Sequence, residues 1–265
     1  MIRTNMLQTS AARKIVEQRG MYTLMEYERD LSVSPESAAT AYFASRMNVR
    51  KRQVVANMDG TKGVILQAGA MQMMMGNIQA ATNIKGASDL MRKFVGSKVT
   101  GESAVKPKYV GYGLLVLEPT YRYILFEDLA NWNGHMVIED GLFLACDDTI
   151  DLRVVARTNL SSAVLGNEGL FNSCLTGHGI AVLESPVPAE ELLVIDVEND
   201  TVRIDGSMAI AWSNTLEFTV ERTTATLIGS AASGEGLVNV YRGNGRILVA
   251  PVANNRWISV PKVGK

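Results

Sequence analysis

The strongest constraint on this chain is a repeat with a period of 66 residues. A Gly-x-Gly pair next to an apolar run occurs three times, with first glycines at Gly111, Gly177 and Gly243. A fixed period of this kind is typical of an architecture made by duplication of one unit. We therefore expect three quasi-repeats, staggered along residues 50–252, with pseudo-threefold symmetry.

The repeated glycine and glutamate positions are expected to be structural. These positions are Glu102, Gly111, Gly113, Glu168, Gly177, Gly179, Glu235, Gly243 and Gly245. Each Gly-x-Gly precedes a predicted strand, so we expect a tight turn or bulge where a Cβ atom would clash. A nucleotide-binding loop is excluded, because such a loop needs a helix after the glycines.

Each repeat has the pattern of short strands. Runs rich in branched residues, such as 114–117, 124–126, 192–197 and 202–204, are separated by Asn, Asp and Gly turn signals. Repeated strands without helices between them predict an all-β sandwich or barrel. We expect one β domain over residues 50–265.

Residues 1–49 are expected to form an N-terminal extension with a short helix. Ser34 followed by Pro35 is typical of a helix start, and residues 37–47 continue the pattern. A second short helix is expected over residues 10–19.

Composition limits the class of protein. Of 265 residues 47% are hydrophobic, which excludes a disordered chain. No apolar run is long enough for a transmembrane helix, and the N-terminus has no signal-peptide core. Cys146 and Cys174 cannot form a disulfide framework, so we expect a reducing, cytoplasmic location.

The near-neutral net charge hides an asymmetry. Residues 1–110 hold 16 Lys and Arg against 8 Asp and Glu, whereas residues 111–265 hold 10 against 19. The densest basic group, Arg46, Arg50, Lys51 and Arg52, is a candidate site for an anionic partner such as RNA or acidic lipid. The alternatives are a solvated face, or subunits that pack basic face to acidic face. No DNA partner is expected.

Methionine is also concentrated in the first half of the chain. Four of the 13 methionines lie in the run Ala70-Met-Gln-Met-Met-Met75. Because methionine fills irregular gaps and adapts to varied surfaces, we favour core or subunit-interface packing here over a metal site.

Catalytic and metal-binding constellations are missing from the sequence. Cys174 and His178 are four residues apart, about 13 Å along an extended strand, which is too far for proton transfer. Two histidines and two separated cysteines supply a zinc site poorly. We therefore expect no catalytic residues, no metal and no cofactor.

Taken together, the repeated elements resemble a known family. The motifs Gly101-Glu-Ser-Ala, Tyr109-Val-Gly-Tyr-Gly-Leu-Leu-Val-Leu-Glu, Asp140-Gly-Leu-Phe-Leu-Ala-Cys-Asp and Ser233-Gly-Glu-Gly-Leu-Val-Asn-Val-Tyr-Arg-Gly-Asn-Gly are similar to the altered-inheritance-of-mitochondria (number twenty-four) family. The resemblance covers residues 50–252. It implies a fold like that of the tryptophan RNA-binding attenuation protein (TRAP-like), assembly into trimers or larger rings, and bacterial relatives of unknown function.

These observations favour a non-enzymatic, homo-oligomeric scaffold or binding protein. One alternative is binding of an anionic polymer or membrane surface through the basic half. Another is a β-barrel that binds or converts a small molecule in a polar pocket.

Overall fold

The computed structural model describes residues 2–81, 106–156, 171–222 and 237–252. Its strands are β1 Arg13–Arg19, β2 Tyr22–Tyr27, β3 Arg52–Asp59, β4 Val64–Leu66, β5 Met71–Ala81, β6 Lys108–Leu117, β7 Tyr123–Asp128, β8 His135–Ile138, β9 Phe143–Asp147, β10 Ile150–Ala156, β11 Phe171–Gly177, β12 Ile180–Ser185, β13 Leu193–Asp205, β14 Ala209–Ser213, β15 Glu217–Arg222 and β16 Leu237–Val249. The helices are α1 Ala38–Arg46 and two short 3₁₀ turns, Leu129–Trp132 and Ala189–Glu191. The chain is therefore mostly β, as its sequence predicts.

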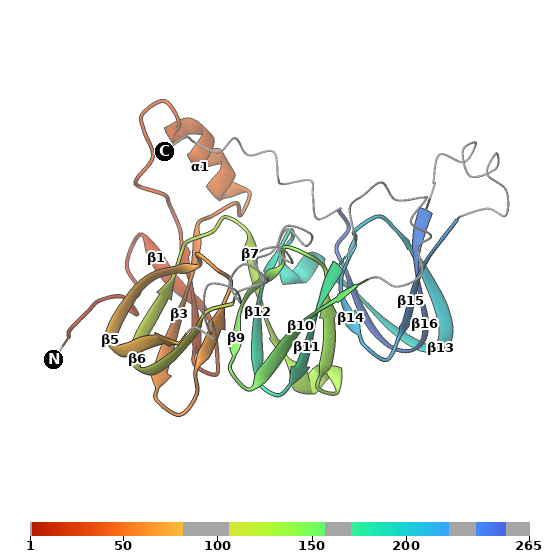
Figure 1. The fold of residues 1–265 in the computed structure, drawn as a ribbon. Helices are drawn as coiled ribbons and strands as arrows, with labels where there is room; N and C mark the ends of the chain where they lie inside the picture. Colours follow the sequence, from red (N-terminus) through yellow and green to blue (C-terminus); the bar gives the residue numbers. More distant parts are fainter. Residues whose placement is uncertain (1, 82–105, 157–170, 223–236, 253–265) are drawn as a thin grey trace, which may run out of the picture.

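The strands form two curled sheets that join three units in a row (Figure 1). The first sheet runs β1-β2-β3-β6-β4-β9-β12-β7, with β5 paired to β6. The second runs β10-β11-β8-β14-β16-β13, with β15 paired to β16. Pairing of β4 with β9 links the first unit to the middle one, and pairing of β8 with β14 links the middle unit to the third.

Three strand pairings share one irregularity in their register. The β-bulge lies opposite Leu117 and Val116 in β6, opposite Leu183 and Val182 in β12, and opposite Val249 and Leu248 in β16. These partner positions are 66 residues apart in both steps. A bulge bends its strand and increases the local twist. The same local bend therefore occurs at the equivalent position of each of the three units.

Each unit encloses apolar side chains of its own. Leu66, Leu115 and Leu117 lie in the core of the first unit. Met136 and Phe143 lie in the middle core, while Trp212 and Tyr241 lie in the third. Burial of these side chains is the main stabilising contribution to such a fold.

The Gly-x-Gly pairs lie within long strands or at a strand junction, not in turns ahead of strands. Gly111 and Gly113 are inside β6, with φ angles of 125° and 142°. A Cβ atom at Gly113 would lie 2.0 Å from the carbonyl oxygen of Met75 on β5. These glycines therefore allow two backbones to approach closely. Gly243 and Gly245 lie inside β16, and Gly177 and Gly179 flank the junction of β11 and β12. Glu102, Glu168 and Glu235 lie outside the described residues.

The helix expected over residues 10–19 is wrong, because this segment contains strand β1. Its backbone pairs with β2 along the register Arg13↔Tyr27 to Arg19↔Tyr22. Pairing with a neighbouring strand overrides local helical preference here. The helix expected over 37–47 is confirmed as α1. It begins at Ala38, after Ser37, so the start expected at Ser34 is three residues too early.

Within residues 1–49, the strands and the helix have different surroundings. Strand β2 pairs with β3 and so extends the first sheet. Helix α1 projects above that sheet and has no buried residue (Figure 1). One wall of the cleft described below is formed by this projecting helix.

Candidate functional site

The four predicted basic residues lie where α1 leads into β3. Arg46 is in the last turn of α1, Arg50 and Lys51 follow in the connecting segment, and Arg52 begins β3. The structure thus brings them to one end of the first sheet, as their closeness in sequence predicts.

Three of these four side chains are held by carboxylates of the segment that begins with β2. Arg50 Nη1 lies 2.8 Å from Glu26 Oε1 and 3.1 Å from Glu28 Oε2. Arg52 Nη2 lies 2.9 Å from Glu26 Oε2, and both of those side chains are buried. Lys51 Nζ lies 3.0 Å from Asp30 Oδ1. Buried ion pairs of this kind are costly to break from one side.

The hydrogen bonds of this network also lower the pKa values of two of its carboxylates. The hydrogen bond from Lys14 is the main reason that the pKa of Glu28 is lowered. Burial alone would raise the pKa of Asp30, but hydrogen bonds from Ser32, Tyr121 and Lys51 outweigh it and hold that pKa well below its usual value. Both carboxylates are therefore charged at neutral pH.

Arg46 differs from its three neighbours. Its Nε and Nη2 atoms donate hydrogen bonds of 3.3 and 3.0 Å to the hydroxyl of Tyr42, and its guanidinium lies 5.2 Å from that ring's centroid. Within the described ranges no ion pair joins Arg46 to a carboxylate. Among the described residues, Arg46 therefore carries a charge that no carboxylate neutralises.

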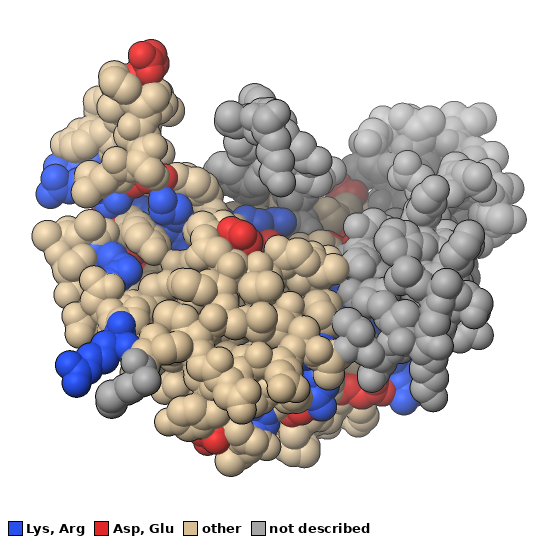
Figure 2. Space-filling view, turned by 60° about the vertical axis from the view of Figure 1, so that its left-hand side comes forward, with Lys and Arg blue, Asp and Glu red and all other residues tan. Residues whose placement is uncertain are grey.

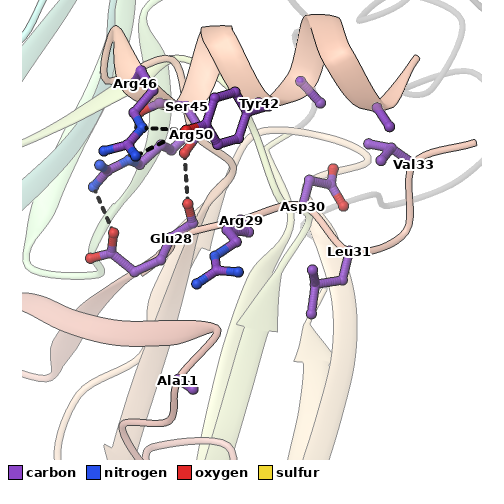
Figure 3. Close-up of a pocket in the computed structure, with 12 residues that line it drawn as sticks. Ala11, Glu28, Arg29, Asp30, Leu31, Val33, Tyr42, Ser45, Arg46 and Arg50 are labelled. Carbon is purple, nitrogen blue, oxygen red and sulfur yellow. Dashed lines mark hydrogen bonds and ion pairs between the residues drawn. The ribbon is translucent and has the colours of Figure 1, made fainter. Parts of the chain in front are cut away.

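A cleft of about 670 Å³ separates α1 from residues 28–33. We call it the α1 cleft. It is lined by Ala11, Glu28, Arg29, Asp30, Leu31, Val33, Ala38, Ala41, Tyr42, Ser45, Arg46 and Arg50. Figure 3 shows Arg46 and Arg50 at one end of the helix, with Arg29 on the strand side.

Two hydrogen bonds fix the end of α1 over this cleft. Ser45 Oγ donates to the carbonyl oxygen of Glu28 over 2.6 Å. Arg50 Nε donates to the carbonyl oxygen of Ser45 over 3.1 Å (Figure 3). The helix is thus positioned by polar contacts and not by a buried apolar face.

Sequence reasoning missed Arg29 and the acidic side of this network. The signal is the alternation of Glu26, Glu28 and Asp30 with its period of two, which places side chains on one face of a strand. Arg50 and Arg52 show the same period, and Glu26 pairs with Arg52 in the β2–β3 register. The acidic and basic patterns can be recognised as partners only when β2 and β3 are known to be neighbouring strands.

The cysteines and histidines are placed apart from this cleft. Cys174 is buried on β11, while His178 is exposed. Burial raises the pKa of the Cys146 thiol, which disfavours its nucleophilic thiolate form. Among the residues that the structure places, no group of three or more His, Cys, Asp or Glu side chains could hold a metal ion.

Comparison with known proteins decides the family. The family described as mitochondrial biogenesis AIM24 matches residues 45–252. This chain belongs to the AIM24 family. An uncharacterised protein of Streptococcus pyogenes serotype M6, M6_Spy0233, is 29% identical over 194 residues, which are 70% of this chain and 75% of the relative.

A solved structure supports the same fold. The crystal structure of SPYM3_0169 from Streptococcus pyogenes matches 78% of this chain and 90% of its own with a TM-score of 0.58 and 25% identity. The family resemblance seen in the sequence motifs is therefore confirmed. In the parts of the AIM24 chain described above, no helix is long and apolar enough to cross a membrane.

Proposed function

We propose that this AIM24 protein is a non-enzymatic scaffold that assembles from copies of itself into trimers or larger rings in the cytoplasm. In this proposal the three units are quasi-repeats related by pseudo-threefold symmetry, in a TRAP-like fold. The bulges that recur at 66-residue steps support this symmetry.

The open edge of β5 is the observation that carries the assembly proposal. This strand has 11 residues and, within the described part of the chain, pairs only with β6. It contains no charged residue and no proline. Natural proteins protect such edges with charges, proline or short length, because an open edge pairs readily with another chain. The unprotected edge of β5 therefore favours pairing with a second copy.

The side chains of β5 fit the same interpretation. Met73 and Met74 are 39% and 40% exposed, and Tyr112 on the neighbouring strand is 68% exposed. Figure 2 shows the corresponding side of the molecule as a broad area with few charged side chains. Methionine and tyrosine are enriched in protein–protein interfaces.

Strand β13 is another edge strand, but it is protected by charged residues. This strand also lies at a sheet edge and exposes Leu193 and Val194. However, β13 carries Asp196, Glu198 and Asp200, and Asp196 pairs with Arg246 at 2.7 Å. These charges discourage pairing with another edge, so β5 is the better candidate for assembly.

Light scattering coupled to size-exclusion chromatography tests the proposal. We expect the wild type to elute as a trimer or larger species, and the Met73→Lys/Met74→Lys variant to dissociate toward monomer at the same concentration. Val194→Lys, which adds a charge to an exposed position of β13, should leave the assembly intact. A wild type that stays monomeric at every concentration would contradict the proposal.

The anionic-partner alternative now depends mainly on Arg46. Arg50, Lys51 and Arg52 already have carboxylate partners, so they offer less free charge to a polymer or membrane surface. Cosedimentation with RNA or acidic vesicles at low salt tests this alternative, with Arg46→Glu expected to lose retention. Absence of retention in the wild type would exclude it.

A further inference from the structure

We infer that the α1 cleft binds a small amphiphilic anion, with a phosphate or carboxylate head near Arg46 and Arg29 and a short apolar tail along the cleft wall. This site is independent of the β5 edge, so it extends the proposed scaffold function. The inference has three supports, which are the surplus of positive charge, the apolar wall and the size of the hollow.

Positive charge exceeds negative charge around the cleft. Four cations, Lys14, Arg50, Lys51 and Arg52, meet three carboxylates, Glu26, Glu28 and Asp30. Arg29 and Arg46 line the cleft in addition and form no ion pair within the described residues. Three cations, Arg29, Arg46 and Arg50, line the cleft itself, against two lining carboxylates, Glu28 and Asp30. This leaves a local excess of positive charge that an anion would offset.

Guanidinium groups are well suited to this ligand chemistry. Arginine presents several N–H donors in a planar fork that matches the oxygens of phosphate and carboxylate. Arg46 directs two of its donor nitrogens to the single oxygen of Tyr42, leaving other N–H groups available. An anion that accepts these hydrogen bonds would be held at the end of α1.

The remaining wall of the cleft is apolar and open to solvent. Leu31 is 74% exposed and Tyr42 is 52% exposed, although both line a concave site. Val33, Ala38 and Ala41 complete this part of the wall. Contact with a hydrocarbon tail would remove apolar surface from water, which is favourable.

The dimensions favour a small molecule over a macromolecule. A volume of about 670 Å³ lies within the usual range for small-molecule sites. Figure 3 shows lining side chains both on α1 and on the segment after β2, residues 28–33, so a ligand would sit between two walls.

Isothermal titration calorimetry with decyl phosphate, below its micelle concentration, tests the inference. We expect saturable binding with one site per chain, and binding of inorganic phosphate at least tenfold weaker because it lacks the tail. Arg29→Gln/Arg46→Gln should weaken decyl phosphate binding by tenfold or more. Arg19→Gln, a control at an exposed arginine paired with Glu17, should bind as the wild type does.

A second variant tests whether binding needs the space of the cleft, apart from its charge. Ala41→Trp would fill the hollow without changing its charge, and we expect it to abolish binding while the urea midpoint stays the same. Absence of binding in the wild type, or equal binding in the double arginine variant, would overturn the inference. Binding to phosphatidylglycerol vesicles without binding of free decyl phosphate would also overturn it, in favour of a surface contact.

Discussion

At the scale of single residues, the glycines of β6 show how sequence controls the approach of two strands. Gly113 has a positive φ angle, and its Cα lies against the backbone of Met75 and Gly76. A side chain there would be strained both by its backbone conformation and by collision. The repeated glycines can therefore be explained without any ligand.

Replacing Gly113 with alanine should destabilise the protein strongly. The new Cβ would lie 2.0 Å from the Met75 carbonyl oxygen, so the β5–β6 pairing must shift. We expect a loss of about 2–4 kcal/mol in the free energy of unfolding, measured by urea denaturation. Gly69→Ala is the matched control, because Gly69 has φ of 83° but no atom within 4 Å of the added Cβ. Its expected cost is about 1 kcal/mol, and equal costs for the two variants would contradict this account.

A second residue-scale prediction concerns Tyr121. Burial, followed by its hydrogen bond to Asp30, raises the pKa of Tyr121 from 10.0 to about 12. Because the folded-state pKa is raised, the stabilisation is complete below pH 10 and is lost as pH rises through 12.

The Tyr121→Phe variant tests this contribution. It should lose less stability than the wild type between pH 10 and 12, measured by the urea midpoint at each pH. The difference should be below about 1 kcal/mol, since Tyr121 is half exposed. Identical pH profiles for the two proteins would show that the hydrogen bond to Asp30 contributes no measurable stability.

At the scale of elements, α1 is the part of the structure least tied to the cores. None of its residues is buried, and its end is fixed by Ser45 and Arg50 hydrogen bonds. Elements with few buried contacts open locally at low free-energy cost. We expect α1 to unfold before the sheets do.

Ala44→Pro tests this separation of helix from sheet. Proline in a helix interior costs about 3 kcal/mol locally, so α1 should be lost. The urea midpoint of the sheets, followed by the fluorescence of Trp132 and Trp212, should change little because α1 contributes no buried residue to any core. Ala56→Pro is the positive control, since Ala56 is buried in β3 and pairs with β2 and β6. A large drop in midpoint for Ala44→Pro would show that α1 supports the sheets.

Individual elements were predictable where the signal is local. The helix at residues 37–47 and the apolar strands of the three units follow from short patterns in the chain. Strand β1 does not, because its structure depends on pairing with β2. The carboxylate partners of Arg50 and Arg52 could not be predicted for the same reason. Glu26 and Glu28 come close to these arginines only when β2 and β3 pair. The basic residues were identifiable from sequence, but their neutralisation was not.

At the scale of the whole molecule, opposite charges pair both within and between the two halves of the chain. Much of the basic character of residues 1–110 is offset locally, as in Arg50 with Glu26. Contacts between the two halves add to this, as in Lys62 with Asp147 at 3.3 Å and Lys108 with Asp148 at 2.8 Å. The charge asymmetry along the chain therefore gives limited support for basic-to-acidic contacts between subunits. The uncharged edge of β5 is the stronger basis for assembly.

Hydrogen exchange along β5 tests the assembly claim most directly. In a monomer, the amides of residues 71–81 that point away from β6 have no strand partner within the described structure. Pairing with a second copy would protect them, and protection should rise with protein concentration. We predict slower exchange confined to β5 at 200 µM compared with 1 µM, and no such change in the Met73→Lys/Met74→Lys variant. Exchange of the β5 amides that is independent of concentration, in a protein shown by light scattering to form oligomers, would contradict assembly through this edge.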